Sequence, residues 1–205
     1  QVYSCWCAGN WKPRAELPLD GTDYVFIDPG IANPCAALWV RVMRPELRML
    51  SSGVMAPVSD FWLFGEYYKR GVSDVSRHVE SIMAMSAAMC SKPVKYYIDV
   101  WAGNRSHPSV GSGPSTCIEV WRQAGLPVMP TSSGREMYKP ERFRLTEKWV
   151  KLKDNSVGNV YGINDMAHFR RELYKYVVKG LVDPAVKVSS MRKEEFKGDN
   201  HLIFG

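Results

Sequence analysis

Two aspartates in this sequence each end a short apolar run. Asp28 follows residues 24–27 and precedes a Pro-Gly turn, and Asp99 follows residues 94–98 and precedes a polar, glycine-rich loop. Short apolar runs bounded by turn residues predict buried strands, here with an aspartate at each C-terminal tip. One aspartate alone also fits a simple turn former. Two such tips on neighbouring parallel strands would place two carboxylates side by side, a position that favours a bound cation.

Carboxylates that lie a few ångströms apart repel, and each raises the pKa of the other unless a cation lies between them. Oxygen-only ligands suit Mg²⁺ or Mn²⁺. A third carboxylate would complete a two-ion site, with the ions roughly 3.5–4 Å apart, that can hold both oxygens of a phosphodiester displacement. The candidates are Asp199, Glu80 and Glu66. We favour Asp199, which lies at an expected helix start, although an ordinary N-cap would look the same.

Basic residues lie close in sequence to two of these acids and are candidates for DNA binding. The loop after Asp99 contains Arg105 and His107, which could contact a phosphate or could simply be solvated. A basic run before Asp199 would neutralise backbone phosphates and make binding depend on salt, and its alternative is a plain solvated segment. The run consists of Lys187, Arg192, Lys193 and Lys197.

The elements that would position these side chains alternate in type along the chain. Strands are expected at residues 24–28, 36–43, 61–68, 94–99 and 126–129. Helices are expected at residues 74–90, 116–125, 140–152 and 165–179, with another starting near Asp199. Three close strands predict an antiparallel meander, and the helix crossover lets the fourth strand lie parallel to the first. The expected fold is therefore a mixed α/β sheet covered by helices.

Composition narrows the class of protein. The chain has 205 residues, 45% hydrophobic and 23% charged, with a net charge of +6, which favours a polyanionic partner. No apolar stretch is long enough to span a bilayer. Five cysteines form no disulfide pattern, which favours a reducing compartment, and Cys5-Trp6-Cys7 lacks the second pair that a structural zinc site needs. No P-loop motif is present.

We expect two regions in the chain and a longer parent protein. Residues 1–21 contain tryptophans and prolines without a clear period, and we expect an N-terminal arm or a linker from a preceding domain. Residues 22–205 would form the main domain. The chain starts on Gln1 and stops within an apolar run, which suggests a piece of a longer protein.

The sequence resembles the C-terminal nuclease domain of the large terminase subunit of tailed bacteriophages. Four motifs in order carry this resemblance, namely Asp28-Pro29-Gly30 with Asn33-Pro34, Tyr97-Ile98-Asp99, Glu172-Leu173-Tyr174-Lys175-Tyr176, and Asp199-Asn200-His201-Leu202-Ile203. The resemblance covers about residues 22–205. It implies a ribonuclease H-like fold, in which three antiparallel strands are followed by two parallel strands.

The resemblance also implies site residues. Asp28 and Asp99 would be the strand aspartates that ligate two Mg²⁺ or Mn²⁺ ions, and Asp199 would be the helix carboxylate. The family usually has a second acid a few residues after this position, where the present sequence has Phe204. Either Asp199 is the ligand, or His201 contributes, or the site is unusual.

The function implied is that of an endodeoxyribonuclease. It would cut double-stranded concatemeric viral DNA during genome packaging, with one ion activating water and the other stabilising the leaving oxygen. The partners implied are an N-terminal packaging ATPase domain, the small terminase subunit and the portal, in the cytoplasm of an infected host cell, without a membrane. Two alternatives stay open: another ribonuclease H-like nuclease such as a resolvase or integrase core, and a catalytically silent DNA-binding packaging module.

Overall fold

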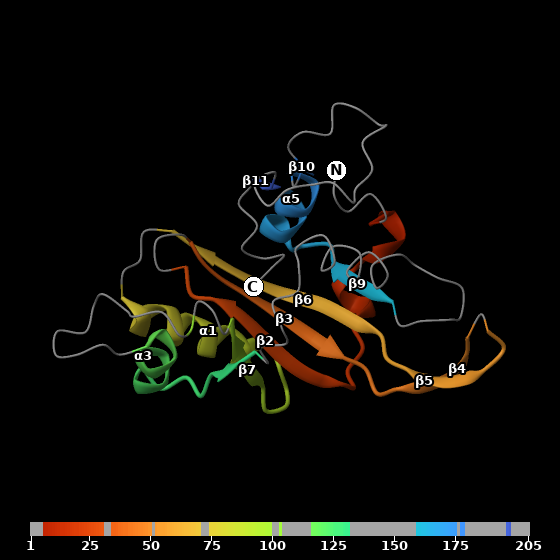
Figure 1. The fold of residues 1–205 in the computed structure, drawn as a ribbon, viewed down its shortest axis with the longest axis horizontal. Helices are drawn as coiled ribbons and strands as arrows, with labels where there is room; N and C mark the ends of the chain where they lie inside the picture. Colours follow the sequence, from red (N-terminus) through yellow and green to blue (C-terminus); the bar gives the residue numbers. More distant parts are fainter. Residues whose placement is uncertain are drawn as a thin grey trace.

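Seven strands form one central sheet in the computed structural model of this protein (Figure 1). The structure describes residues 6–30, 34–50, 52–70, 74–99, 103, 116–131, 159–175, 177–178 and 196–197. The sheet strands are β1 (Trp11–Lys12), β2 (Thr22–Asp28), β3 (Cys35–Val42), β6 (Phe61–Lys69), β7 (Lys95–Ile98), β8 (Met129–Pro130) and β9 (Val160–Ile163). The helices are α1 (Val75–Met89), α3 (Cys117–Gln123) and α5 (Ala167–Lys175), with short 3₁₀ turns at Ala8–Asn10 and Arg14–Glu16.

The strand order is β1-β9-β6-β3-β2-β7-β8. Strand β3 runs antiparallel to both of its neighbours, β6 and β2, and β7 and β8 continue the sheet parallel to β2. This arrangement confirms the predicted mixed sheet of three antiparallel and then two parallel strands. Strands β9 and β1, which the sequence did not predict, extend the other edge in parallel with β6.

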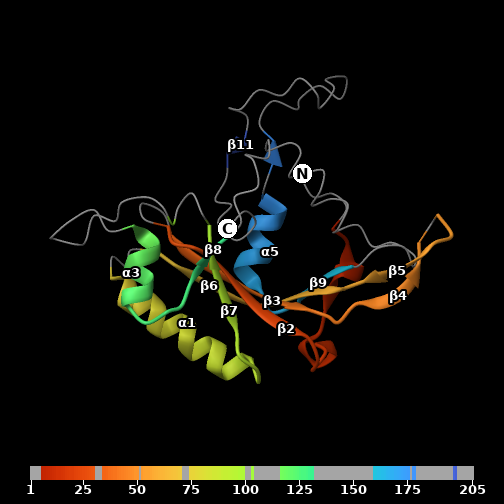
Figure 2. The same ribbon diagram turned by 60° about the horizontal axis from the view of Figure 1, so that its bottom comes forward.

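Helices α1 and α3 cover one face of the sheet, and α5 lies on the other (Figures 1 and 2). The Asp74 side chain caps α1 by accepting from the backbone N–H of Ser76, and the buried residues of α1 follow a helical period. On the sheet, Trp39 donates its indole N–H to Ser86 of α1 at 3.0 Å. Gly65 lets this helix approach closely, because a Cβ there would lie 2.7 Å from the Met89 methyl group.

The N-terminal residues that the structure describes pack against α5. Trp6 and Trp11 lie 5.2 Å apart between ring centroids, and both contact Phe169 of α5 edge-on. Arg170 places its guanidinium 5.3 Å from the Trp11 ring centroid. The expected division at residue 21 stays a prediction, but β1 belongs to the same sheet as the rest of the chain.

A separate two-stranded hairpin follows β3 and precedes β6 in the chain, and it projects from the sheet (Figure 1). Its strands are β4 (Glu46–Met49) and β5 (Met55–Val58). Arg48 anchors it through two hydrogen bonds of 2.9 and 2.8 Å to the Asp60 carboxylate. Asp60 also accepts the backbone N–H of Asn159 at 2.7 Å. One carboxylate thus ties the hairpin to the residues that lead into β6 and β9.

Two expected helices, at residues 140–152 and near Asp199, lie outside the described residues. In the part of the chain that the structure describes, no helix has the length and apolar character needed to cross a membrane.

Candidate metal and nuclease site

The two strand-end aspartates lie next to each other where β2 and β7 end, at the carboxyl ends of two neighbouring strands. Ile27 of β2 pairs with Ile98 of β7 in parallel register, so the next residues, Asp28 and Asp99, are neighbours. The backbone N–H of Asp99 donates to the carbonyl of Ile27 at 3.3 Å, which continues the ladder past the end of β7. The helix crossover through α1 produces this parallel pairing, as the sequence predicted.

Local backbone contacts fix both aspartates. Asp28 Oδ1 accepts the backbone N–H of Gly30 at 3.2 Å, and Gly30 has a φ of 54°. The positive φ favours glycine at this turn, because a side chain would strain the backbone there. The carbonyl of Asp99 accepts the N–H of Gly103 at 2.7 Å. Both aspartates are half-buried, which leaves them partly accessible at the sheet edge.

Two buried thiols lie close enough to Asp28 to sense its charge. Burial raises the pKa of the Cys117 thiol to about 11, and the Asp28 carboxylate adds to this effect. Burial also raises the pKa of the Cys35 thiol, with further contributions from Asp28 and Cys117. Neither thiol shares the face of the Asp28 carboxylate: Cys35 precedes Ala36, the register partner of Asp28, and Cys117 begins α3, which covers the opposite face of the sheet (Figure 2). The donors at this edge are oxygens, which fit Mg²⁺ or Mn²⁺ rather than a thiophilic metal.

Neither Glu66 nor Glu80 lies where it would supply a third carboxylate beside Asp28 and Asp99. The Glu66 carboxylate accepts the backbone N–H groups of His168 and Phe169, at 2.8 and 2.6 Å, at the start of α5. Glu80 is exposed on α1, which covers the opposite face of the sheet. Glu66 therefore caps a helix, and Glu80 lies in solvent.

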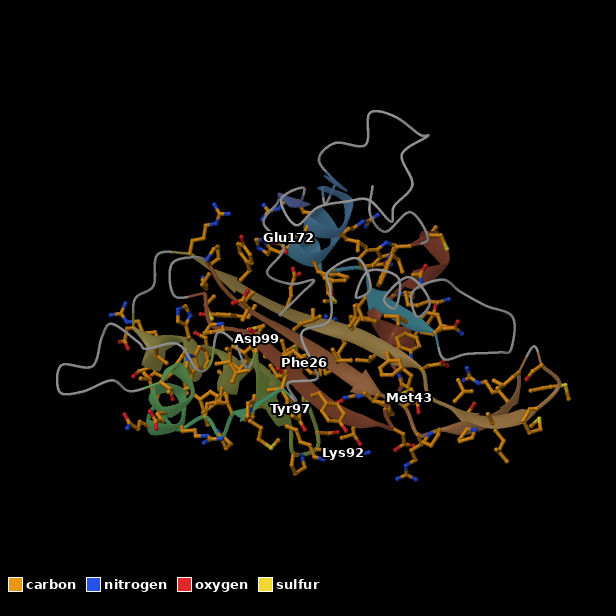
Figure 3. All side chains as sticks on the ribbon, in the orientation of Figure 1. Phe26, Met43, Lys92, Tyr97, Asp99 and Glu172 are labelled. Atoms are coloured by element: carbon orange, nitrogen blue, oxygen red, sulfur yellow. The ribbon has the colours of Figure 1, made fainter. Side chains whose placement is uncertain are left out.

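Glu172 is an acid that the sequence reasoning did not select as a ligand. It is only 3% exposed on α5 (Figure 3), and this helix lies on the face that carries Asp28. The spacing contained a signal, because Glu172 follows buried Phe169 by three residues and precedes buried Leu173. Within the described ranges, however, no three His, Cys, Asp or Glu side chains lie close enough together to hold a metal ion.

The remaining predicted site residues fall outside the described ranges, so their roles stay predictions. They are Asp199, His201, Arg105, His107, Lys187, Arg192 and Lys193. The backbone of Lys197 is described in the short strand β11 (Phe196–Lys197), which pairs antiparallel with β10 (Val177–Val178).

Solved structures that match this fold include large terminases of bacteriophages. The large terminase of a thermophilic bacteriophage, in complex with ATP-gamma-S, matches with a TM-score of 0.59 at 15% identity, over 98% of this chain and 42% of that one. Another crystal form of the same thermophilic-phage protein matches with a TM-score of 0.57 at 15% identity, over 98% and 41%. The large terminase nuclease domain of P22 matches with a TM-score of 0.50 at 16% identity, over 86% and 78%.

The present chain therefore spans about two fifths of the thermophilic-phage terminase and most of the isolated P22 nuclease domain. No family model matches the sequence. No curated protein matches it either. The structural matches establish that the chain has the ribonuclease H-like fold of the terminase nuclease domain.

Proposed function

We propose that this chain is a metal-dependent endonuclease domain of the large-terminase type, which cuts double-stranded viral DNA during genome packaging. The observation that carries this proposal is the parallel register of β2 and β7, in which Asp28 and Asp99 follow the paired residues Ile27 and Ile98 at neighbouring strand ends. In α/β sheets, sites form at the carboxyl ends of strands, and here these ends carry acids. The fold shared with the P22 nuclease domain supports the same assignment.

Asp28 and Asp99 would hold the metal through their carboxylate oxygens, and Asp199 is proposed as the third ligand, with His201 as its alternative. Mg²⁺ or Mn²⁺ bound there would supply a Lewis acid for phosphodiester hydrolysis. The Gly30 N–H bond to Asp28 holds that carboxylate in place before any ligand arrives. Arg105, His107 and the basic run at 187–197 would contact the DNA backbone. In a full-length protein, we expect an ATPase domain, a small subunit and a portal as partners.

A plasmid cleavage assay with Mn²⁺ or Mg²⁺ tests the proposal. We expect the wild-type domain to nick and linearise supercoiled DNA, and we expect Asp28→Asn and Asp99→Asn to reduce the rate by at least about 100-fold, because metal-held transition-state charge is worth several kcal/mol. Asp20→Asn is the matched control, since Asp20 is an exposed carboxylate that pairs with Lys92 at 3.3 Å. A folded Asp28→Asn protein that cuts at the wild-type rate would refute the site.

A further inference from the structure

Three aromatic rings line the sheet face that carries the two aspartates. Residues two apart in a strand point to the same face, so Tyr24 and Phe26 share the face of Asp28. Tyr97 of β7 lies directly across from Phe26 in the parallel register. The Phe26 and Tyr97 ring centroids are 5.7 Å apart with an interplanar angle of 22°, and Tyr24 lies 6.5 Å from Phe26. We name Tyr24, Phe26 and Tyr97 the aromatic strip; Figure 3 labels Phe26 and Tyr97 beside Asp99.

The strip is only partly buried, unlike the other face of the same strands. Tyr24, Phe26 and Tyr97 are half-buried, whereas Val25 and Ile27, which alternate with Tyr24 and Phe26 along β2, are fully buried against the opposite layer. Phe26 also packs against the hydrophobic core, and the parts of the three rings that stay exposed leave an aromatic surface that a ligand can contact.

Helix α5 occupies a different part of this face. Its contacts run to β6, where Tyr68 stacks on His168 at 5.0 Å and Glu66 binds the helix N-terminus. The aromatic strip lies on β2 and β7, beyond β3 in the strand order. The strip and α5 therefore occupy separate parts of one face.

A cation and a flexible thioether border the strip. Lys95 is exposed and places its Nζ 5.8 Å from the Tyr24 ring centroid. Met129 of β8 pairs with Tyr97 and is 39% exposed. The rings, the lysine and the methionine together provide aromatic surface, a positive charge for a phosphate, and an adaptable apolar contact.

The acids and the rings of the aromatic strip follow one another along the direction of β2 and β7. Phe26 and Tyr97 each precede an aspartate by two residues, which is about 7 Å of strand, and Tyr24 and Lys95 are about 7 Å further along. A DNA strand with its scissile phosphate at Asp28 and Asp99 would therefore place adjoining nucleotides over the strip.

We propose that the aromatic strip binds unpaired bases of the DNA strand next to the scissile phosphate. This inference rests on the proposed nuclease function of the same edge. Stacking on Tyr24, Phe26 and Tyr97 requires open base faces, which an intact duplex does not present, and Lys95 supplies a phosphate contact. The substrate class is thus DNA with a locally unpaired stretch, such as a frayed, gapped or single-stranded segment, bound with little sequence preference.

Equilibrium binding without metal separates this surface from catalysis. Fluorescently labelled oligo-dT and a duplex of equal length are titrated with wild-type protein, Phe26→Leu and Tyr97→Leu in EDTA. We expect each leucine variant to bind oligo-dT about 5- to 150-fold more weakly, the range for one lost base stack, and to bind duplex nearly as well as wild type. Tyr161→Leu is the matched control, because Tyr161 also packs against an aromatic ring and a lysine, Trp62 and Lys12, but lies on β9.

A photocrosslinking experiment keeps the proposal falsifiable if the leucine variants do not fold. Wild-type protein is irradiated with a single-stranded oligonucleotide that contains 5-iodouracil, and the crosslinked peptide is mapped. Crosslinks to the peptides of β2 or β7 support the proposal, and crosslinks confined to other segments overturn it. Folded Phe26→Leu and Tyr97→Leu proteins with unchanged affinity for oligo-dT would overturn it as well.

The two proposals fail in different ways. If wild-type protein binds oligo-dT through the strip but never cleaves DNA with Mn²⁺, the nuclease function fails and the binding surface stands. If metal-dependent cleavage depends on Asp28 and Asp99 but the strip variants bind and cleave gapped DNA like wild type, the nuclease function stands and the strip proposal fails.

Discussion

At the scale of single residues, Asp23 stabilises the fold, whereas Asp28 and Asp99 are the proposed metal ligands. Asp23 lies five residues before Asp28 on β2, but it is 2% exposed and pairs with Arg41 through hydrogen bonds of 2.6 and 2.7 Å. Arg41 also donates to the carbonyl of Pro18 and lies 5.0 Å from the Phe64 ring centroid. Because strand residues alternate between faces, Asp23 points away from the face of Asp28.

Removing Asp23 should destabilise the protein strongly. Asp23→Ala leaves the buried guanidinium of Arg41 without its counter-charge, at a cost of about 3–5 kcal/mol in the free energy of unfolding. Urea unfolding measures the difference. Asp20→Ala breaks the exposed ion pair with Lys92 and should change stability by less than about 0.5 kcal/mol. Equal losses in the two variants would contradict this assignment.

The sequence predicted which acids lie at strand ends, but it did not predict which acids are buried by packing. Asp28 and Asp99 follow apolar runs, and this local pattern is visible in one dimension. The burial of the Asp23–Arg41 pair depends on the pairing of β2 with β3 and on what packs over both strands, and that information lies outside the local sequence. Glu66 stayed a candidate ligand in the sequence because its contact with α5 joins residues about 100 positions apart. A local pattern does not reveal such a contact.

At the scale of elements, the Glu66 cap fixes where α5 begins on the sheet. A carboxylate at a helix N-terminus satisfies unpaired N–H groups and interacts favourably with the helix dipole. Asp165, just before the helix, is a residue type that often caps helices, but its carboxylate pairs with Arg14 at 2.7 Å instead. A long-range cap of this kind has no signature in the local sequence.

Glu66→Ala should loosen α5 specifically. We expect a loss of about 1–2 kcal/mol in the free energy of unfolding, because two backbone N–H groups lose their acceptor. Hydrogen exchange should increase at the amides of His168 and Phe169 more than in α1. Glu46→Ala is the control, since Glu46 is exposed on the hairpin. Unchanged exchange at the start of α5 would count against the cap.

The attachment of the hairpin predicts a dependence of stability on pH. Burial alone would raise the pKa of Asp60, but the Arg48 ion pair and the Asn159 N–H outweigh burial and lower it. A carboxyl whose folded-state pKa is lowered stabilises the fold above its unfolded pKa, near 3.9, and this contribution is lost as the pH falls through the folded value.

We therefore expect Asp60→Asn to be less stable than wild type at pH 7, with the difference shrinking as the pH falls below about 4. Urea unfolding between about pH 7 and pH 3 measures it. Glu46→Gln removes the exposed partner of the same arginine and should show almost no difference at any pH. A difference between Asp60→Asn and wild type that grows on acidification would contradict the ion-pair account.

Most central strands and both helices of the α1 and α3 layer were predicted close to their observed bounds, because each has a clear hydrophobic period and turn residues at its ends. Strand β1 was missed because two residues are too short for a periodic signal, and β9 was missed because Gly162 and the polar residues 154–159 before it are typical of a loop. They form because Asn10 donates to the carbonyl of Val160 at 2.9 Å and Trp11 packs over Gly162, contacts made across about 150 residues.

At the scale of the whole molecule, the net charge of +6 should make DNA binding depend strongly on salt. If the basic run at 187–197 contacts phosphates, replacing Lys187, Arg192, Lys193 and Lys197 together by alanine should reduce the slope of log K against log salt by about 3–4 for duplex DNA, about 0.9 per lost contact. Fluorescence anisotropy at several salt concentrations measures the slope. An unchanged slope would show that these residues are only a solvated segment.

The central claim is that the adjacent tips of β2 and β7 hold divalent metal. A crystal of the domain soaked in millimolar Mn²⁺ tests this directly through anomalous scattering at the manganese edge. We predict an anomalous peak about 2.0–2.3 Å from carboxylate oxygens of both Asp28 and Asp99, absent in Asp28→Asn crystals treated in the same way. Manganese bound only elsewhere, with the Asp28 and Asp99 carboxylates ordered and bare, would contradict the account.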